Sequence, residues 1–173
     1  MTLFRFFTAF TVLIMAISIA GCDNSSSPSA QAPRFSFTDI NGKDYDSESL
    51  KNHVTMVKFW TTDCTTCVAQ MPDNIEYYNE FHDQGFDLIA VALKHDPLDY
   101  VRNFTDSRKL PFTVVSDHDG TISEAFGDIR MTPTAFLIDK QGRIIKRYLG
   151  NYDKAAFKQT LKKALEQSSI TPP

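Results

Sequence analysis

Hydrophobic residues follow strand and helix periods in turn along most of the chain. Short apolar runs rich in β-branched residues predict buried strands, and they cover residues 54–60, 86–93 and 111–115. Helical spacing follows the first two runs, at 64–81, where Pro72 should cause a kink, and after Asp96-Pro97, where Asp96 resembles an N-cap. A last amphipathic helix is predicted by Phe157, Leu161 and Leu165. This alternation predicts an α/β domain.

Turn signals predict two hairpins. An alternating segment at 35–38 precedes Asn41-Gly42, which is a strong hairpin signal. The strands expected at 135–138 and 144–149 flank a short polar turn, so they should pair antiparallel. The expected architecture is therefore a central mixed β-sheet flanked by helices on both faces, with an N-terminal β-hairpin extension.

The start of the chain departs from this pattern. Arg5 is the only charged residue among the first 21, and residues 6–20 are almost continuously apolar. A membrane-spanning helix needs about 20 such residues, whereas a positive start, a short apolar core and small residues at its end are typical of a secretory signal peptide. We therefore expect a signal peptide over residues 1–21, with a short uncleaved anchor as the alternative.

Ile19-Ala20-Gly21-Cys22 resembles the lipobox of bacterial lipoproteins. The resemblance implies that Cys22 is acylated, becomes the first mature residue and anchors the protein to a membrane. Asp23 resembles the signal that retains lipoproteins in the inner membrane, which would place the protein on its periplasmic side if the source is Gram-negative. Residues 22–34 are polar and predict a flexible Ser/Pro/Ala tether. The domain is then expected over 35–168, followed by a disordered tail at 169–173.

The composition of the whole chain is that of one globular domain, with 173 residues, 42% hydrophobic residues and a formal net charge of −3. The negative charge argues against a nucleic-acid-binding protein, which normally has a basic face. Three cysteines are too few for a disulfide-stapled miniprotein. We expect a monomer. We also expect surface histidines and no metal site, because no ligand spacing joins His53, His82, His95 and His118.

Cys64 and Cys67 form a Cys-x-x-Cys pair at the start of an expected helix, directly after a buried strand. Residues three apart lie on one helical face, at about the separation that a disulfide needs. The helix N-terminus stabilises a thiolate at Cys64, which predicts Cys64 as the exposed nucleophile and Cys67 as the resolving residue. A structural disulfide, half of a zinc site and inert buried thiols are the alternatives. We expect no cofactor besides this redox-active pair.

Motifs around the pair resemble the thioredoxin-fold proteins, and in particular the membrane-tethered TlpA/ResA-like thiol–disulfide oxidoreductases. The resemblance covers roughly residues 33–167 and rests on VKFW at 57–60, MPD at 71–73 and TPTAFLIDKQGR at 132–143. It implies a thioredoxin-like fold in which Pro133 is a cis-proline beside the disulfide and the backbone of Thr132 pairs with substrate. It also implies substrate binding by Trp60. An ordinary trans proline at position 133 is the alternative.

Three positions depart from the family pattern and should tune the redox pair. Asp63 stands where the family usually has Trp, and a carboxylate beside the nucleophile opposes thiolate formation. Gln70 replaces the common Glu three residues after the second Cys, and an amide cannot act as a base. Lys58 replaces the buried acid that thioredoxins carry on the preceding strand. A cation there favours a thiolate; a lysine that extends its charged end to solvent is the alternative.

The resemblance implies a thiol–disulfide oxidoreductase, and an oxidising compartment favours the role of a reductase. Within the family, substrates include apocytochrome c thiols and the cysteines of metallochaperones or copper sites, and a membrane-embedded thiol carrier supplies electrons. We therefore expect protein thiols and disulfides as substrates, such a carrier as electron donor, and a role in cytochrome c maturation or metal-site assembly.

Two other functions stay open. The first is a thiol peroxidase of the AhpC/TSA type, because Thr61 lies three residues before Cys64, as in the Pro-x-x-x-Thr-x-x-Cys motif of that family. Arg130 would be the candidate that activates a peroxide, but Val57 stands where the motif has proline. The second is a non-enzymatic copper-delivery lipoprotein, although the usual Cys-x-x-x-Cys and distant His are missing.

The lipobox gives the first testable prediction. Acylation of Cys22 requires its thiol, so Cys22→Ser should leave the precursor unprocessed or release the protein from the membrane. Fractionation of cells into membrane and soluble extracytoplasmic material measures this. Wild-type protein found wholly in the soluble fraction would contradict the anchor.

Overall fold

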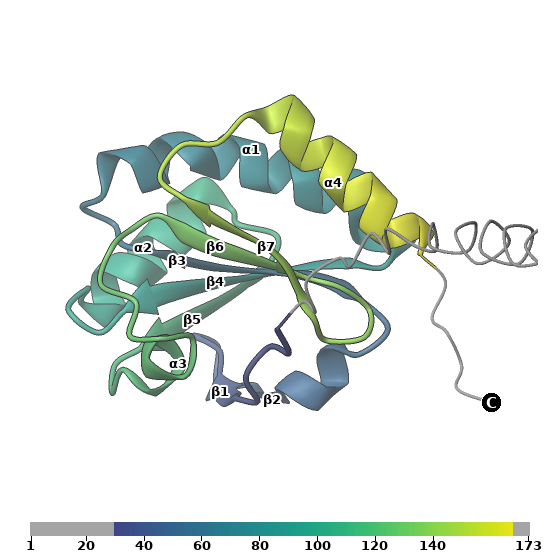
Figure 1. Ribbon diagram of the computed structural model, residues 1–173. Helices are drawn as coiled ribbons and strands as arrows, with labels where there is room; N and C mark the ends of the chain where they lie inside the picture. Colours follow the sequence, from purple (N-terminus) through teal and green to yellow (C-terminus); the bar gives the residue numbers. More distant parts are fainter. Residues whose placement is uncertain (1–29, 168–173) are drawn as a thin grey trace, which may run out of the picture.

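Five strands form the central sheet of the computed structural model, which describes residues 30–167 (Figure 1). Their order across the sheet is β5 (Thr113–Asp117), β4 (Phe86–Leu93), β3 (Val54–Trp60), β6 (Thr134–Ile138) and β7 (Ile144–Leu149). Strands β3, β4 and β5 run parallel, whereas β6 is antiparallel to both β3 and β7. The expected central mixed sheet is confirmed.

Helices cover both faces of this sheet (Figure 1). One face carries α1 (Thr65–Phe81), α2 (Leu98–Arg108) and α4 (Lys154–Glu166), which share a single apolar core with β3. The connections β3–α1–β4 and β4–α2–β5 step in the same direction across the sheet, and right-handed crossovers then place α1 and α2 on the same face. The short α3 (Thr121–Ala125) packs on the other face.

The N-terminal hairpin lies on the same face as α3. Strands β1 (Ser36–Thr38) and β2 (Asp44–Asp46) pair antiparallel, with Phe37 opposite Tyr45 and their rings stacked 5.0 Å apart. The turn between them uses Gly42 at φ 87°, a backbone conformation that glycine adopts without strain. The 3-10 helices η1 (Ser47–Leu50) and η2 (His82–Gln84) follow β2 and α1. The expected hairpin extension is confirmed.

One helix differs from the sequence pattern. The helix α3 was not expected, because its five residues are too few to show a helical period. It begins beside Asp117, whose two carboxylate oxygens accept from the backbone N–H groups of Ile122 and Ser123 at 2.9 Å each. Pro72 lies within α1, and the helix continues through it.

The ordered domain begins before the boundary expected at residue 35. The backbone N–H of Ala32 donates to the carbonyl of Gly142, and that of Ile144 donates to the carbonyl of Ala30, both at 2.8 Å. This segment therefore lies along the start of β7 and belongs to the domain. The tether expected over 22–34 is wrong at its C-terminal end, because backbone pairing orders a polar segment that composition alone leaves unpaired.

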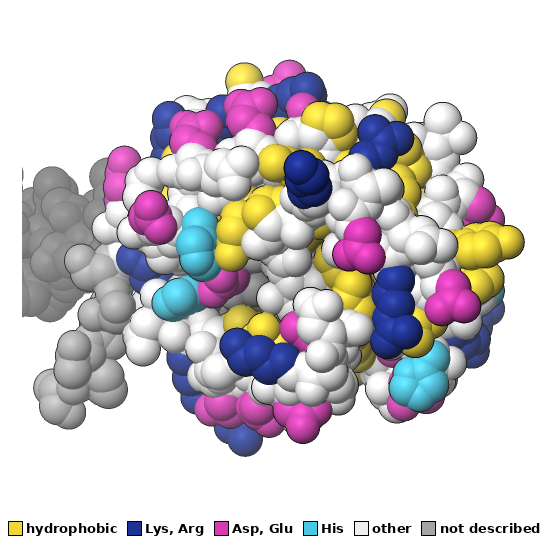
Figure 2. All heavy atoms as spheres, turned by 180° about the vertical axis from the view of Figure 1, so that it is seen from behind, with side chains coloured by type: hydrophobic (Ala, Val, Ile, Leu, Met, Phe, Trp, Pro, Cys, Tyr) yellow, Lys and Arg dark blue, Asp and Glu magenta, His cyan; other side chains and the backbone are white. Residues whose placement is uncertain are grey.

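The remaining N- and C-terminal expectations lie outside the described residues; they are the signal peptide at 1–21, acylation at Cys22, the first part of the tether and the tail at 169–173. Within residues 30–167, no helix has the length and apolar character that a membrane span requires. Figure 2 shows basic and acidic side chains interspersed over one face of the domain, so that face offers no extended basic area for nucleic acid.

Candidate active site

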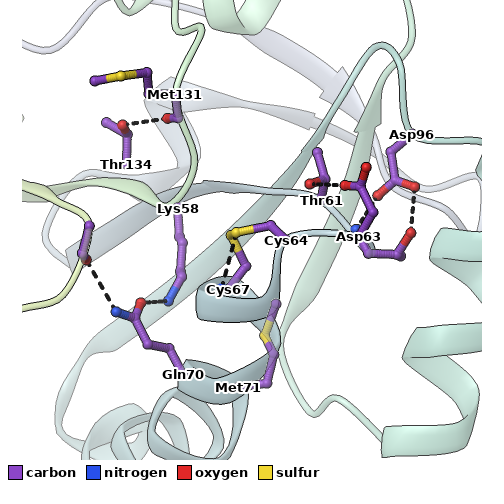
Figure 3. Close-up of a disulfide and its surroundings, with 12 residues drawn as sticks. Lys58, Thr61, Asp63, Cys64, Cys67, Gln70, Met71, Asp96, Met131 and Thr134 are labelled. Atoms are coloured by element: carbon purple, nitrogen blue, oxygen red, sulfur yellow. Dashed lines mark hydrogen bonds between the residues drawn. A yellow bond between two sulfur atoms is a disulfide. The ribbon is translucent and has the colours of Figure 1, made fainter.

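A disulfide joins Cys64 and Cys67 at the start of α1 (Figure 3). Cys64 is the N-cap of the helix, with φ −83° and ψ 101°, and its Sγ accepts from the backbone N–H of Cys67 at 3.1 Å. The two Cα atoms are 5.2 Å apart, within the usual range for a disulfide. The predicted pairing is confirmed.

The two cysteines differ in accessibility. Cys64 is half-buried, whereas Cys67 is 0% exposed. After reduction, the backbone N–H groups of the first turn face Cys64 Sγ and favour its thiolate. The geometry therefore agrees with Cys64 as the attacking sulfur and Cys67 as the resolving one.

Asp96 holds the loop that leads to Cys64. One carboxylate oxygen accepts from the backbone N–H of Thr62 at 2.6 Å, and the other accepts from its hydroxyl at 2.7 Å. Asp96 is 6% exposed. The expected N-cap role is wrong, because Pro97 occupies the N-cap position of α2 and the carboxylate is engaged by Thr62. The sequence gives no signal for this contact between residues 34 apart.

Asp63 is directed away from the disulfide. Its carboxylate accepts a hydrogen bond from the Thr61 hydroxyl at 2.6 Å, and Figure 3 shows it turned toward Thr61. Asp63 is exposed, so water also screens its charge. The carboxylate therefore acts on Cys64 more weakly than adjacency in the sequence implies.

The expected cis-proline is present, because the Thr132–Pro133 peptide bond is cis. Pro133 is buried and Thr132 half-buried. The carbonyl of Pro133 accepts from the backbone N–H of Gly150 at 2.8 Å, and the Thr134 hydroxyl donates to the carbonyl of Met131 at 2.7 Å. The substrate-binding role of Thr132 and Pro133 stays a prediction.

Gln70 connects this loop to α1. Its Nε2 donates to the carbonyl of Gly150 at 3.1 Å and to Oδ1 of Asn151 at 3.2 Å. Since Gly150 also bonds Pro133, the Gln70 amide holds the end of β7 and the cis-proline loop against the redox helix. Gln70 is 8% exposed. Sequence reasoning placed Gln70 in the site but missed Gly150 and Asn151.

Lys58 is fully buried, at 0% exposure. Its Nζ donates to Oε1 of Gln70 at 2.7 Å and to Oδ1 of Asn74 at 3.4 Å. Burial lowers the pKa of the ammonium from 10.5 to about 7, and the Asp73 carboxylate opposes this shift. A lysine that extends to solvent is therefore wrong: the side chain points into the layer between β3 and α1.

Comparison with known proteins agrees with this geometry. The family model described as Redoxin matches residues 27–165. The chain belongs to the redoxin family. The thiol-disulfide oxidoreductase ResA of Bacillus thuringiensis subsp. konkukian is 36% identical over 133 residues, which are 77% of this chain and 76% of the relative. ResA of Bacillus subtilis is 33% identical over 126 residues, 73% of this chain and 69% of that one.

Solved structures show the same likeness. A putative thioredoxin from Neisseria meningitidis matches this redoxin with a TM-score of 0.75 and 36% identity, covering 81% of this chain and 93% of that one. A thiol:disulfide interchange protein from Chlorobium tepidum matches with a TM-score of 0.74 and 28% identity, covering 82% and 99%. With the Cys64–Cys67 disulfide, these relatives show that this redoxin is a thioredoxin-fold thiol–disulfide oxidoreductase of the TlpA/ResA-like type.

Trp60 does not lie where substrate binding requires it. The side chain is 0% exposed and packs against Phe104 of α2, with ring centroids 5.1 Å apart. Residues alternate between the two faces of a strand, and Trp60 is on the face of β3 that the helices cover. Trp60 is thus a core residue of the redoxin, and the assignment to substrate contact is corrected.

The residues considered for a peroxidase are engaged elsewhere. The Arg130 guanidinium is exposed and bonds the Asp128 carboxylate, with Nε donating at 2.8 Å. Val57 packs in the core on the face of β3 opposite α1. These positions give the peroxidase alternative no support.

Two of the four histidines share one carboxylate, a contact that their spacing in the sequence does not predict. Nδ1 of His53 lies 2.5 Å from one Asp87 oxygen, and Nδ1 of His82 lies 3.4 Å from the other. Asp87 is at the start of β4, at the opposite end of the strand from the redox loop. Within residues 30–167, no group of three or more His, Cys, Asp or Glu side chains is placed to hold a metal ion.

The difference in burial predicts the order in which the thiols react. In reduced protein carrying Cys22→Ser, iodoacetamide should modify Cys64 first and at lower pH, because Cys64 is accessible and faces the helix N-terminus. Mass spectrometry of partly alkylated protein measures the order, with Cys64→Ser and Cys67→Ser as matched variants. Faster modification of Cys67 would reverse the assigned roles.

Lys58 predicts a pH-dependent stability with a defined sign. Between about pH 7 and 10.5 the unfolded state keeps a lysine proton that the folded state has lost, so the free energy of unfolding rises with pH across this range. Below pH 7 the buried charge destabilises the fold. We expect Lys58→Met to raise the free energy of unfolding at pH 6 by about 4 kcal/mol and to remove most of this rise.

Urea unfolding of the disulfide form between pH 6 and 10 measures both effects. Lys163→Met is the matched control, because it removes the charge of an exposed lysine on α4. A Lys58→Met protein no more stable at pH 6 than the wild type would contradict a desolvated lysine.

Proposed function

We propose that this redoxin reduces disulfides of extracytoplasmic proteins while a lipid on Cys22 holds it at the membrane. The observation that carries the proposal is the Cys64–Cys67 disulfide at the N-terminus of α1, with one accessible sulfur and one buried sulfur. The signal-peptide pattern and lipobox support an oxidising compartment, where a reductant is needed to open disulfides.

The electrostatic surroundings favour a reductase over an oxidase. A strongly oxidising pair requires a reduced form stabilised by a low-pKa thiolate. Among the described residues, no basic side chain bonds either sulfur. The charged group that holds the loop before Cys64 is the Asp96 carboxylate, which comes from the loop after β4 and accepts from Thr62. Stabilisation of the thiolate then rests mainly on the helix N-terminus, which leaves the disulfide form comparatively stable.

The surface beside the cis-proline suits an extended polypeptide with apolar residues near its cysteines. Met131 precedes this loop and is 57% exposed, and Leu149 on β7 is 51% exposed. Leu149 lies opposite Thr134 in the strand register, and its neighbour Gly150 bonds Pro133. Substrate would add to this edge through the backbone of Thr132, with Met131 and Leu149 as apolar contacts.

Within this proposal, the substrates are cysteine pairs of apocytochromes c or of proteins that receive metal ions. Reduced Cys64 attacks the substrate disulfide, and Cys67 releases the reduced substrate. A membrane-embedded thiol carrier then reduces the Cys64–Cys67 disulfide again. The names of the relatives, a thiol-disulfide oxidoreductase and a thiol:disulfide interchange protein, support exchange with protein cysteine pairs.

Trapping identifies the substrate. Without the resolving thiol, Cys67→Ser should accumulate mixed disulfides with apocytochrome c or metal-site proteins, and Cys64→Ser should accumulate none of them. Gel electrophoresis without reductant, followed by mass spectrometry, detects the adducts. Equal trapping by both variants would contradict the mechanism.

Reduction potential and activity test the direction. We expect a potential below about −200 mV, reduction of insulin disulfides in the presence of dithiothreitol, and no consumption of hydrogen peroxide above that of the Cys64→Ser control. A potential near about −120 mV would indicate an oxidase instead.

A further inference from the structure

Lys58 is buried in the sheet layer beneath the redox helix. Its neighbours across the strands are Ala90 of β4 and Ala135 of β6, whose small side chains leave room for the lysine stem. Along β3 it lies between Met56 and Trp60 on the face that α1 covers. The amine therefore meets α1 instead of solvent.

The part of α1 that the amine meets is the side on which Cys67 lies. Gln70 and Asn74 follow Cys67 by three and seven residues, so the three side chains share one side of the helix, and all are buried. The hydrogen bonds from Lys58 to both amides fix its amine against this side. Figure 3 shows the lysine reaching Gln70 beside the turn that contains the disulfide.

Few other groups near this amine exchange protons. The Asp73 carboxylate on α1 acts on Lys58 through space and is bonded to Lys154 of α4 at 2.5 Å. Tyr77 and Tyr152 are phenols of the same region; burial raises the pKa of Tyr77 to about 12 and that of Tyr152 further, so both stay neutral. The adjacent strands contribute alanines. Among these described neighbours, Lys58 is the group whose pKa lies near neutral pH.

A route to solvent begins at Gln70. Gln70 is one wall of a surface hollow of about 240 Å³, whose other walls include Asp73, Asn151 and Tyr152. Its Oε1 accepts from Lys58 on the inner side, and its Nε2 donates to Asn151 on the outer side. Gln70 therefore contacts the lysine amine and also lines this hollow.

We propose that the Lys58 amine accepts the proton of Cys67 when Cys67 resolves the mixed disulfide, and that it returns this proton to water through the hollow beside Gln70. The inference rests on the direction of exchange proposed above. It gives Cys67 a base although neither Gln70 nor Asn74 can accept a proton.

The chemical step balances as follows for reduction of a substrate disulfide. The Cys64 thiolate breaks that disulfide, releases one substrate sulfur and forms a mixed disulfide with the other. Neutral Lys58 accepts the Cys67 proton, which leaves an ammonium and a thiolate. Cys67 Sγ then bonds Cys64 Sγ, the bond to substrate breaks, and the departing thiolate takes a proton from water. Two electrons pass from the cysteine pair to the substrate, and Lys58 releases its proton to water.

The protonation state of Lys58 supports this role. An ordinary lysine, with a pKa near 10.4, is fully protonated at pH 7 and cannot accept a proton. Burial lowers the pKa of Lys58 to about 7, so the neutral amine is well populated at neutral pH. A base whose pKa lies near the working pH is the most effective proton acceptor.

The test follows reduced full-length protein, with Cys22 acylated or replaced by serine, as it reacts with one equivalent of dithiobis(nitrobenzoate). Attack by Cys64 releases a first coloured thiolate, and resolution by Cys67 releases a second. We expect Lys58→Met to slow the second phase at pH 7 by about tenfold or more, and to shift its pH profile toward that of an ordinary thiol. Lys163→Met should show both phases at wild-type rates.

The two phases separate the two claims. Loss of the first phase in wild-type protein would overturn the proposed function, because Cys64 would not attack a disulfide. A normal first phase with an unchanged second phase in folded Lys58→Met would overturn only the role of Lys58. Near-ultraviolet circular dichroism of the variant establishes that it is folded.

A second measurement needs no substitution at Lys58. Carbon-13 NMR of the lysine Cε signals follows the titration of Lys58 in the disulfide and dithiol forms of wild-type protein, with Lys58→Met used only to assign the signal. Proton exchange with Cys67 predicts a single titration in the disulfide form and two coupled steps in the dithiol form. An identical titration in both forms would overturn the inference even if Lys58→Met failed to fold in the kinetic test.

Discussion

A single side-chain amide, that of Gln70, joins the three parts of this site. Its oxygen accepts from the buried amine of Lys58, and its nitrogen donates to the carbonyl of Gly150. The backbone N–H of Gly150 in turn donates to the carbonyl of Pro133. The redox helix, the sheet interior and the cis-proline loop therefore depend on one group that is both donor and acceptor. A glutamate would place a second oxygen against the Gly150 carbonyl and form an ion pair with Lys58, which would raise the pKa of the lysine.

Local patterns were sufficient for the fold and for the redox pair. The i,i+3 spacing of Cys64 and Cys67 at a helix start favoured a redox pair, and the structure shows the disulfide. The apolar runs located β3 and β4 at their observed bounds. A Lys58 side chain that extends to solvent was inconsistent with the buried strand predicted over 54–60. A strand buried over its whole length leaves a central lysine no path to solvent. Trp60 was misassigned for a related reason: strand alternation turns it toward the helices.

Contacts between distant segments could not be read from the chain. The Asp96–Thr62 contact joins the segments that follow two parallel strands, β3 and β4. At the opposite end of these strands, Asp87 contacts both His53 and His82, which come from different segments. Neither has a periodic or spacing signal, because each depends on the register of β3 against β4. Asp63 shows the converse case: adjacency to Cys64 suggested an electrostatic effect, but the Thr61 hydroxyl turns the carboxylate away.

A buried lysine and a buried acid impose different electrostatics on proton transfer. When a carboxylate takes a proton from a thiol, one negative charge moves from oxygen to sulfur and the total charge is unchanged. When a neutral amine takes the proton, an ammonium and a thiolate form together inside the protein, and this separation of charge is unfavourable unless both ions are stabilised. Here the carbonyl oxygens of Gln70 and Asn74 face the ammonium. Cys67 lies in the first turn of α1, where the helix dipole favours a negative charge. A lysine base at this position therefore requires two neutral amides in place of an acid. The amides stabilise the ammonium, but they do not raise its pKa as a carboxylate would, so the proton can leave again.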